Sequence, residues 1–327
     1  MTTTVMTPSV PMATPLARAA RSSTRRVVIT GGAGFVGRAV VAAFAARGNP
    51  VSVVDRGAHP DPAVHSVVGE LTDPGVVAEA LSSGDVAGVV HLAAVTSVLR
   101  SMEHPTATYQ TNVVVTQDLL ESCRHTGVGR FIMASTNAVV GDVGHAIIDE
   151  SLPPCPLTPY GATKAAGEML LCGYAGAYGM ATCALRFTNI YGPGMAGKDS
   201  IVARMMRAAL ADQGVQIYGD GRQRRDLVHL EDSVAAVLAA WDRSCTGTVI
   251  IGSGRSVTML ELLDMVRAVT GRSLPAEHVA AKPGEMPAVI VDISRARERL
   301  GYRPSVSLRD GLATVWQDFG ETGGSLR

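Results

Sequence analysis

Tyr160 and Lys164 are the two residues whose types and spacing best support acid–base chemistry. They are four residues apart in the segment YGATK, so they share one face of the helix predicted to start at Pro159. A tyrosine hydroxyl, with a pKa of about 10, is a poor base near neutral pH, and a neighbouring ammonium favours its phenolate. Lysine occurs only at positions 164, 198 and 282, and every other basic residue is arginine. The pair therefore predicts a tyrosine base with a lysine partner, and a surface pair one turn apart is the alternative.

Two hydroxyl residues, Ser135 and Thr136, close a strand predicted to begin at Arg130. At the carboxyl end of a strand, a hydroxyl can hydrogen-bond a substrate oxygen and steady the proton of the tyrosine. Capping of the next segment is the alternative interpretation.

A glycine-rich turn, GGAGFVG, follows a β-branched strand and opens a helix. Gly31 permits the tight turn, Gly34 lets a pyrophosphate approach the backbone, and Gly37 lets helix and sheet pack closely. Asp55 ends the next predicted strand, where its carboxylate can accept both ribose hydroxyls and repel a 2′-phosphate. The pattern favours NAD over NADP, although Arg56 partly offsets that preference. An ordinary strand–helix turn remains the alternative.

The elements that must position these residues alternate between strand and helix up to about residue 190. Predicted strands cover 25–30, 51–55, 86–92 and 130–135, and predicted helices cover 39–47 and 106–125. The last third is less regular, with helices predicted over 200–211, 230–241, 259–269, 295–300 and 308–319, and short strands over 215–218 and 249–251. This predicts an α/β protein with a doubly wound parallel (Rossmann) sheet and a smaller mixed α/β substrate domain.

The chain is expected to divide into a tail and two domains. Residues 1–24 contain no acidic residue and no sustained apolar period, which predicts a disordered tail, although arginines in such a segment also imitate an organelle transit peptide. Residues 25–190 would form the NAD-binding domain and residues 191–327 the nucleotide-sugar-binding domain, with some later segments returning to the first.

Composition excludes several classes of protein. The 327 residues carry 29 basic and 29 acidic side chains, so nothing favours wholesale binding to nucleic acid or to an anionic membrane. The longest apolar runs have eight residues, far short of the ~20 that span a bilayer. Five widely spaced cysteines form no CxxC motif, which predicts no metal site and favours a reducing, cytoplasmic compartment.

Further motifs occur in order along the chain: HLAA (91–94), Asn112, STNAVVG (135–141), LRFTNIYGPG (185–194), YGDGRQRRDLVHLED (218–232) and KPGEMPAVIVDISRARERLGYRP (282–304). With the glycine turn and YGATK, these resemble the extended short-chain dehydrogenase/reductase superfamily, in its nucleotide-sugar epimerase/dehydratase branch. The resemblance covers residues 26 to 319 and implies bound NAD.

The resemblance also implies roles for individual residues. It implies catalysis by Tyr160 as base with Lys164, Thr136 and Ser135. It implies NAD contacts from Gly31, Gly34, Phe35, Val36, Gly37, Asp55, Arg56, Glu70, Leu71, Leu92, Ala93, Ala94, Asn112, Tyr160 and Lys164. It implies nucleotide-sugar contacts from Thr136, Asn137, Tyr160, Asn189, Arg225, Lys282 and Val289, with lysine at 282 where arginine is usual.

Departures from the family pattern narrow the reaction. Dehydratases of the branch carry an Asp-Glu pair after the strand-end threonine, decarboxylases keep a glutamate there, and a 3,5-epimerase would want cysteine at 138. Asn137 and Ala138 occupy these positions, although Lys198 matches a lysine of the 3,5-epimerase. The resemblance therefore favours a 4-epimerase, in which C4 is oxidised by bound NAD, the 4-keto sugar rotates, and C4 is reduced again.

Several alternatives remain open at this point. UDP is the expected nucleotide, with TDP and GDP as alternatives, and the small Val289 hints at a bulkier C2 substituent on the sugar. Net oxidoreduction of a nucleotide-linked keto sugar, a 3,5-epimerase and a non-catalytic NAD-sensing regulator are the other functions considered. A homodimer is expected through the Tyr–Lys helix, with Met169, Leu170 and Tyr174 as a candidate apolar seam.

Overall fold

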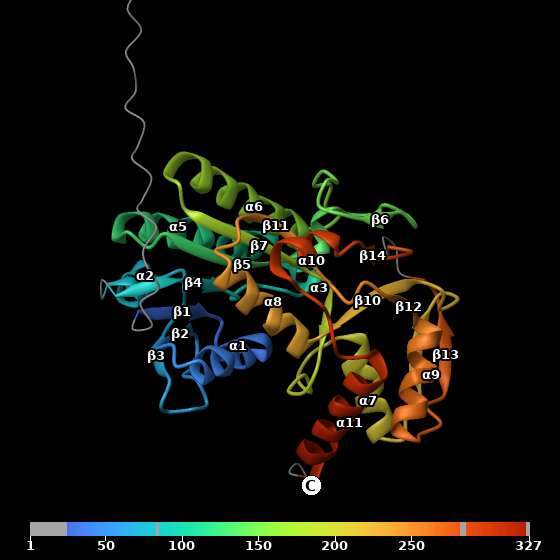
Figure 1. Cartoon of the computed structure of the whole chain (residues 1–327). Helices are drawn as coiled ribbons and strands as arrows, with labels where there is room; N and C mark the ends of the chain where they lie inside the picture. The colour runs from blue at the N-terminus through green and yellow to red at the C-terminus, as the bar shows by residue number, and fades with distance from the viewer. Residues whose placement is uncertain (1–24, 83–84, 282–285, 325–327) are drawn as a thin grey trace, which may run out of the picture.

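One large parallel sheet forms the centre of the molecule. The computed structural model describes residues 25–324 except 83–84 and 282–285, so the tail predicted over 1–24 lies outside the described residues. Seven parallel strands lie in the order β11-β7-β5-β4-β1-β2-β3. Their bounds are β1 (Arg26–Thr30), β2 (Val51–Asp55), β3 (His65–Val68), β4 (Val86–His91), β5 (Arg130–Thr136), β7 (Ala181–Phe187) and β11 (Gly247–Ile251) (Figure 1). This order confirms the predicted doubly wound fold.

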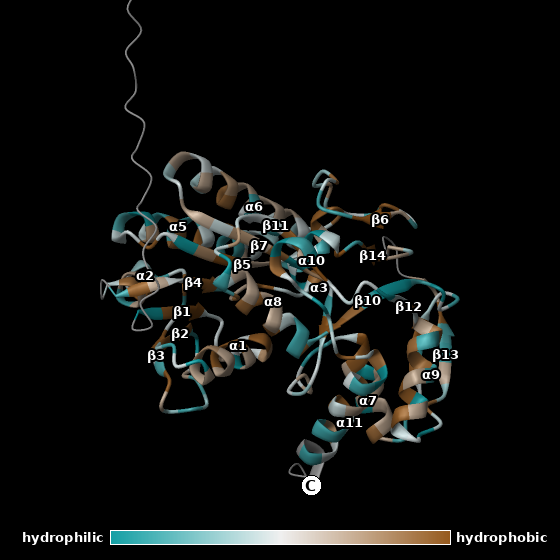
Figure 2. Ribbon diagram, viewed as in Figure 1, coloured by the Kyte–Doolittle hydropathy of each residue, from teal (hydrophilic) through white to brown (hydrophobic). Residues whose placement is uncertain are grey.

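The interior strands are continuous β-branched runs because both faces of the sheet are covered. In β1 the residues from Val27 to Thr30 are all buried, and Figure 2 shows this strand as hydrophobic. On one face lie α1 (Phe35–Ala46), α8 (Leu230–Asp242) and α10 (Ser294–Leu300). On the other lie α2 (Pro74–Leu81), α5 (Val115–Thr126) and α6 (Pro159–Tyr178).

A smaller part of the chain has its own hydrophobic core. Its sheets are β12 (Ser256–Thr258), β10 (Arg224–His229) and β8 (Asn189–Tyr191), together with β13 (Ala276–Val279) paired to β9 (Val215–Tyr218). Its helices are α7 (Ile201–Leu210), α9 (Met259–Thr270) and α11 (Leu308–Gly324). Helix α9 begins with a capping box, in which Thr258 and Glu261 exchange hydrogen bonds. A last pair, β6 (Ile147–Ile148) and β14 (Ile290–Val291), joins distant segments.

Three segments beyond residue 190, β11, α8 and α10, extend the large sheet or pack on it. Strand β11 pairs with β7 at its edge, and α8 contributes Val237 and Trp241 to the core on the α1 face. The chain therefore passes between the two parts more than once, and the division at residue 190 stays a prediction.

The helix predicted over 106–125 is observed in three pieces. These pieces are α4 (Pro105–Tyr109), a π-helical turn, Gln110–Val114, and α5, and the separate short helix α3 (Val98–Glu103) precedes them. Asn112 lies in this turn and is fixed to the loop after β4, an interaction that periodicity alone does not reveal. Such single π-helical turns are frequent at functional sites.

Within the described ranges, no helix combines the length and the apolar character needed to cross a membrane. Over the same ranges, no group of three or more His, Cys, Asp or Glu side chains is arranged to hold a metal ion.

Candidate active site

Tyr160 lies in the first turn of α6. The turn is fixed by two hydroxyls: Thr158 Oγ1 accepts from Gly161 N at 3.2 Å, and Ser101 Oγ accepts from Tyr160 N at 3.1 Å. Pro159, at the first helical position, has no N–H to leave unpaired. The backbone of Tyr160 is therefore held by the helix cap and by α3.

The phenol of Tyr160 is hydrogen-bonded to the Thr136 side chain, at the carboxyl end of β5. Burial raises the pKa of Tyr160 to about 12, and this hydrogen bond acts in the opposite direction. Thr136 Oγ1 also accepts from Ala138 N at 3.2 Å, so the predicted capping role is present beside the contact with Tyr160. The structure therefore brings two of the predicted catalytic residues together.

Lys164 lies one turn further along α6 and is 3% exposed. Its Nζ donates to the Ala134 carbonyl at 2.9 Å. Burial lowers the pKa of Lys164 to about 8, against the opposing effect of the Glu168 carboxylate. Burial thus raises the pKa of Tyr160 in this structure, and the expectation that the ammonium and a bound nicotinamide ring together bring it toward neutrality stays a prediction.

Ser135 points away from this pair. Its Oγ donates to Glu168 Oε1 at 2.5 Å, and Glu168 also forms a buried ion pair with Arg186 at 2.7 Å. Ser135 and Thr136 both meet α6, Ser135 at Glu168 and Thr136 at Tyr160, eight residues earlier on the same helix. The geometry gives Ser135 a place in the support of α6 and no contact with Tyr160.

The glycine turn has the shape that a dinucleotide needs. Gly31 adopts a φ of +72°, and a Cβ there would lie 2.7 Å from Ala93 N. A Cβ on Gly37 would lie 2.0 Å from the Gly31 carbonyl oxygen. Gly34 caps α1 with no side chain, so the first N–H groups of the helix, including those of Phe35 and Val36, point toward the position of a bound pyrophosphate. These residues fit NAD.

Asp55 ends β2 beside this turn. Its Oδ2 accepts from Ala33 N at 3.0 Å and its Oδ1 from Arg56 N at 2.7 Å. A carboxylate has about four acceptor positions, so both ribose hydroxyls can still be bound. Arg56 and Glu70 are exposed, whereas Leu71 is buried in the core beneath them.

The loop after β4 is fixed to the sheet by a chain of polar groups. His91 lies between Thr30 (2.7 Å) and Thr116 (3.2 Å), and Ala93 N donates to Thr30 Oγ1 at 3.3 Å. Burial, followed by the charge of Lys164, lowers the pKa of His91 to about 3, so His91 is neutral. Leu92 and Ala94 are half-buried in this loop, and the backbone of Leu92 lies next to Gly31.

Asn112 supports this loop from the other side. Its amide makes hydrogen bonds with Val95 N (2.8 Å), Val95 O (3.0 Å) and Thr163 Oγ1 (3.0 Å). These contacts tie the loop after β4 to α6, so Asn112 positions the predicted cofactor site and is itself 2% exposed.

The predicted nucleotide-sugar residues lie in several segments. Asn137 follows Thr136 and is buried, and Asn189 is exposed on β8, where its amide donates to Asp226 O at 3.1 Å. Arg225 is half-buried on β10. Val289 is 1% exposed within the core of the large sheet, and Lys282 lies outside the described residues.

Sequence reasoning missed the residues that hold the predicted ones. Ser101 contacts Tyr160, and Thr163 contacts Asn112. Glu168 contacts both Ser135 and Arg186. The sequence could have indicated Glu168, because it follows Lys164 by four residues and therefore lies on the same face of the helix.

Comparison with known proteins decides the family. Residues 27–252 match the model of the "NAD dependent epimerase/dehydratase family". The chain belongs to this family. It is 31% identical over 314 residues to a UDP-glucose 4-epimerase of Corynebacterium glutamicum, covering 89% of this chain and 94% of that protein. It is 30% identical over 306 residues to a dTDP-glucose 4,6-dehydratase of Streptomyces niveus, covering 88% and 90%.

Solved structures of this epimerase/dehydratase family agree with the fold. The UDP-glucose 4-epimerase of Thermus thermophilus, in complex with NAD, superposes with a TM-score of 0.85 at 31% identity. The match covers 90% of this chain and 99% of that one.

Proposed function

We propose that this protein is an NAD-dependent nucleotide-sugar 4-epimerase that acts on a UDP-sugar. The observation that carries the proposal is the contact between Tyr160 and Thr136 above a buried Lys164, with no carboxylate at positions 137 and 138. Similarity to UDP-glucose 4-epimerases supports the choice of reaction and nucleotide.

Bound NAD supplies a reversible acceptor for the hydride of C4. Tyr160 takes the proton of the C4 hydroxyl as its phenolate and returns it to the 4-keto oxygen after the sugar has rotated. Thr136 hydrogen-bonds the phenol and thereby lowers its pKa. The buried ammonium of Lys164 provides the positive charge nearest along the helix face, and the charged nicotinamide ring would add to it.

The similarity to a dTDP-glucose 4,6-dehydratase makes dehydration the second candidate. Removal of water across C5 and C6 needs an acid and a base beside the strand-end threonine. Asn137 and Ala138 provide neither, so the proposal favours epimerisation.

The test uses the purified protein without added cofactor. UDP-glucose, UDP-N-acetylglucosamine and UDP-glucuronate are incubated separately, and absorbance at 340 nm and product identity are followed. Conversion to the C4 epimer without net absorbance change supports the proposal. A 4-keto-6-deoxy product would identify a dehydratase. In a parallel incubation with NAD added, stoichiometric reduction of that NAD would identify a dehydrogenase.

A variant links the activity to the site. Tyr160→Phe removes the proton-transferring hydroxyl and should abolish epimerisation while leaving thermal unfolding unchanged. Retention of activity in this variant would overturn the assignment of Tyr160.

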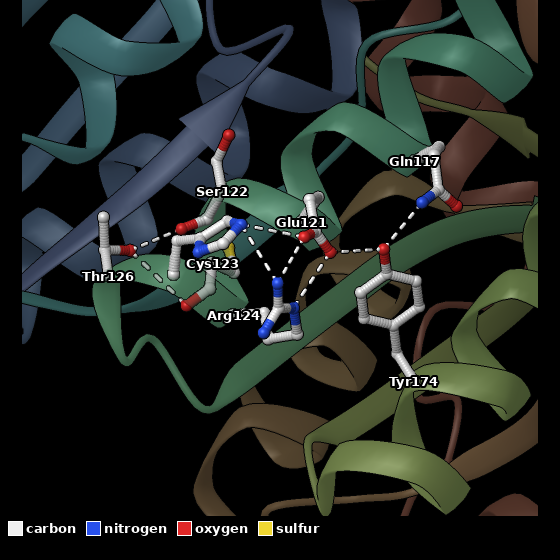
Figure 3. Close-up of polar contacts among 8 residues, drawn as sticks. Gln117, Glu121, Ser122, Cys123, Arg124, Thr126 and Tyr174 are labelled. Atoms are coloured by element: carbon white, nitrogen blue, oxygen red, sulfur yellow. Dashed lines mark hydrogen bonds and ion pairs between the residues drawn. The ribbon is translucent and has the colours of Figure 1, made fainter.

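We further propose that the protein is a homodimer formed through α5 and α6. Met169 is 57% exposed and Tyr178 46% exposed on α6, and Tyr109 is 53% exposed on the neighbouring α4. The other two predicted seam residues are used within the chain. Leu170 packs against the core, and the Tyr174 hydroxyl accepts from Gln117 Nε2 at 2.6 Å and donates to Glu121 Oε2 at 2.9 Å (Figure 3).

Sedimentation at micromolar concentration tests the dimer. Met169→Asp should shift a dimer to monomer, whereas Leu210→Asp, on the surface of α7, should not. A wild-type protein that sediments as a monomer would refute the proposal. We place the protein in the cytoplasm because all five cysteines are free, and fractionation of cells that express it tests this.

A further inference from the structure

A cavity of about 670 Å³ lies in the smaller part of the molecule. Its walls come from β10, β12, α9, α10 and the segment that leads into α11. None of the residues assigned above to NAD or to the nucleotide sugar lines it.

Positive charge dominates the wall of this cavity. Four arginines, Arg255, Arg297, Arg303 and Arg309, all of them exposed, line its open side together with three serines, and the lining contains no aspartate or glutamate. None of the four guanidinium groups forms an ion pair or a hydrogen bond with a residue that the structure describes. The nearest carboxylates of α9 are otherwise engaged, since Glu261 caps that helix and Asp264 pairs with Arg267.

Two buried carboxylates fix the segments that carry these arginines. Asp226, which is fully buried, accepts from Ser253 N at 2.8 Å and from Arg255 N at 3.1 Å. Asp232, 4% exposed, accepts from Ser305 N at 2.9 Å and from Val306 N at 3.2 Å. Both carboxylates accept from backbone N–H groups of segments that line the cavity, and of the four arginines Arg297 also helps to lower the pKa of Asp292 through its charge.

The remaining lining is apolar, with Leu227, Val257 and Met265 among its members. A volume of this size holds a small organic molecule, and arginine binds phosphate through parallel hydrogen bonds. We propose that this cavity is a second binding site, which takes a phosphorylated small molecule whose apolar or aromatic part rests on Leu227, Val257 and Met265. The site is independent of the proposed epimerase activity.

The experiment uses the full-length protein saturated with NAD and UDP, so that the catalytic site is filled. Adenosine 5′-diphosphate and inorganic pyrophosphate serve as probes in calorimetric titrations. The double variant Arg303→Ser/Arg309→Ser removes two cavity arginines. The control Arg47→Ser/Arg272→Ser removes the same charge from residues that pair with Asp242 and Asp212 outside the cavity. Thermal unfolding and substrate-free NAD binding confirm that each variant is folded.

We expect adenosine 5′-diphosphate to bind the wild type and the control equally and the cavity variant at least tenfold more weakly. It should also bind more tightly than pyrophosphate, and its affinity should fall with added salt. Absence of binding to the wild type, or equal weakening in both double variants, would overturn the site. Equal affinity for the two probes would overturn the apolar part of the assignment.

Discussion

Lys164→Met provides a quantitative test of the buried ammonium. Methionine has nearly the same length and volume as lysine but carries no charge. Burial shifts the pKa of Lys164 from its usual 10.5 to about 8. At 1.36 kcal/mol for each unit, a charged Lys164 costs the folded protein about 3 kcal/mol at pH 7. The variant also loses the hydrogen bond to the Ala134 carbonyl, which destabilises it by about 1 kcal/mol. We therefore expect Lys164→Met to raise the free energy of unfolding by about 2 kcal/mol.

The pH dependence gives this prediction its sign. In the unfolded chain Lys164 keeps its proton up to its usual pKa, whereas in the folded chain it loses the proton near pH 8. Between these two pH values the unfolded state binds more protons, so the stability of the wild type rises with pH. The advantage of Lys164→Met should therefore be present at pH 7 and disappear between about pH 8 and pH 10.5.

Denaturant unfolding of NAD-free protein at several pH values measures the difference. Lys198→Met is the control: this lysine is exposed in surface area, but burial lowers its pKa and its Nζ lies 5.8 Å from the centroid of the Phe35 ring, so its substitution should change stability in the same direction and by less than Lys164→Met. Lys164→Met should at the same time lose epimerase activity, since the charge that destabilises the fold is the one that the site uses. A variant that is less stable than the wild type at pH 7, or whose difference does not change up to pH 10.5, would refute the reasoning.

Three further predictions concern the groups around this lysine and the glycine turn. Glu168→Gln leaves a buried guanidinium without its counter-charge and should lower the free energy of unfolding by about 3–5 kcal/mol, measured by denaturant titration. Gly37→Ala places a Cβ 2.0 Å from a backbone oxygen and should abolish NAD binding in a fluorescence titration, whereas Gly176→Ala, with open space around it, should not. Thr136→Val removes the hydrogen bond that lowers the pKa of Tyr160, so the rise of kcat with pH should move to higher pH, and an unchanged pH profile would argue against that bond.

The strands of the large sheet were predictable where the sequence is continuous and β-branched, as in Val51–Asp55. The strand His65–Val68 was missed because it lies at the edge, is short, and is largely exposed. The segment 249–251 was recognised as a strand, but its partner was not. Only the tertiary structure shows that it extends the large sheet beside β7.

The candidate site shows the same limit. Helical spacing places Tyr160 and Lys164 on one face, and the structure has them there. Spacing does not reveal how α6 is placed along β5, and this decides that Ser135 contacts Glu168 while Thr136 contacts Tyr160. It also does not reveal how deeply Tyr160 and Lys164 are buried, and burial raises the pKa of the tyrosine and lowers that of the lysine.

The face of α6 that carries Tyr160 also explains how a lysine stays charged at 3% exposure. Glu168, one turn beyond Lys164, opposes the fall of its pKa, and Arg186 holds the Glu168 carboxylate through hydrogen bonds of 2.7–3.1 Å. The charges therefore alternate from Lys164 through Glu168 to Arg186, and each buried ion has a partner of opposite sign. Removal of the carboxylate would leave two buried cations, so the lysine would become neutral more easily. Support of Tyr160, the proposed base, thus extends through α6 to Arg186 on β7.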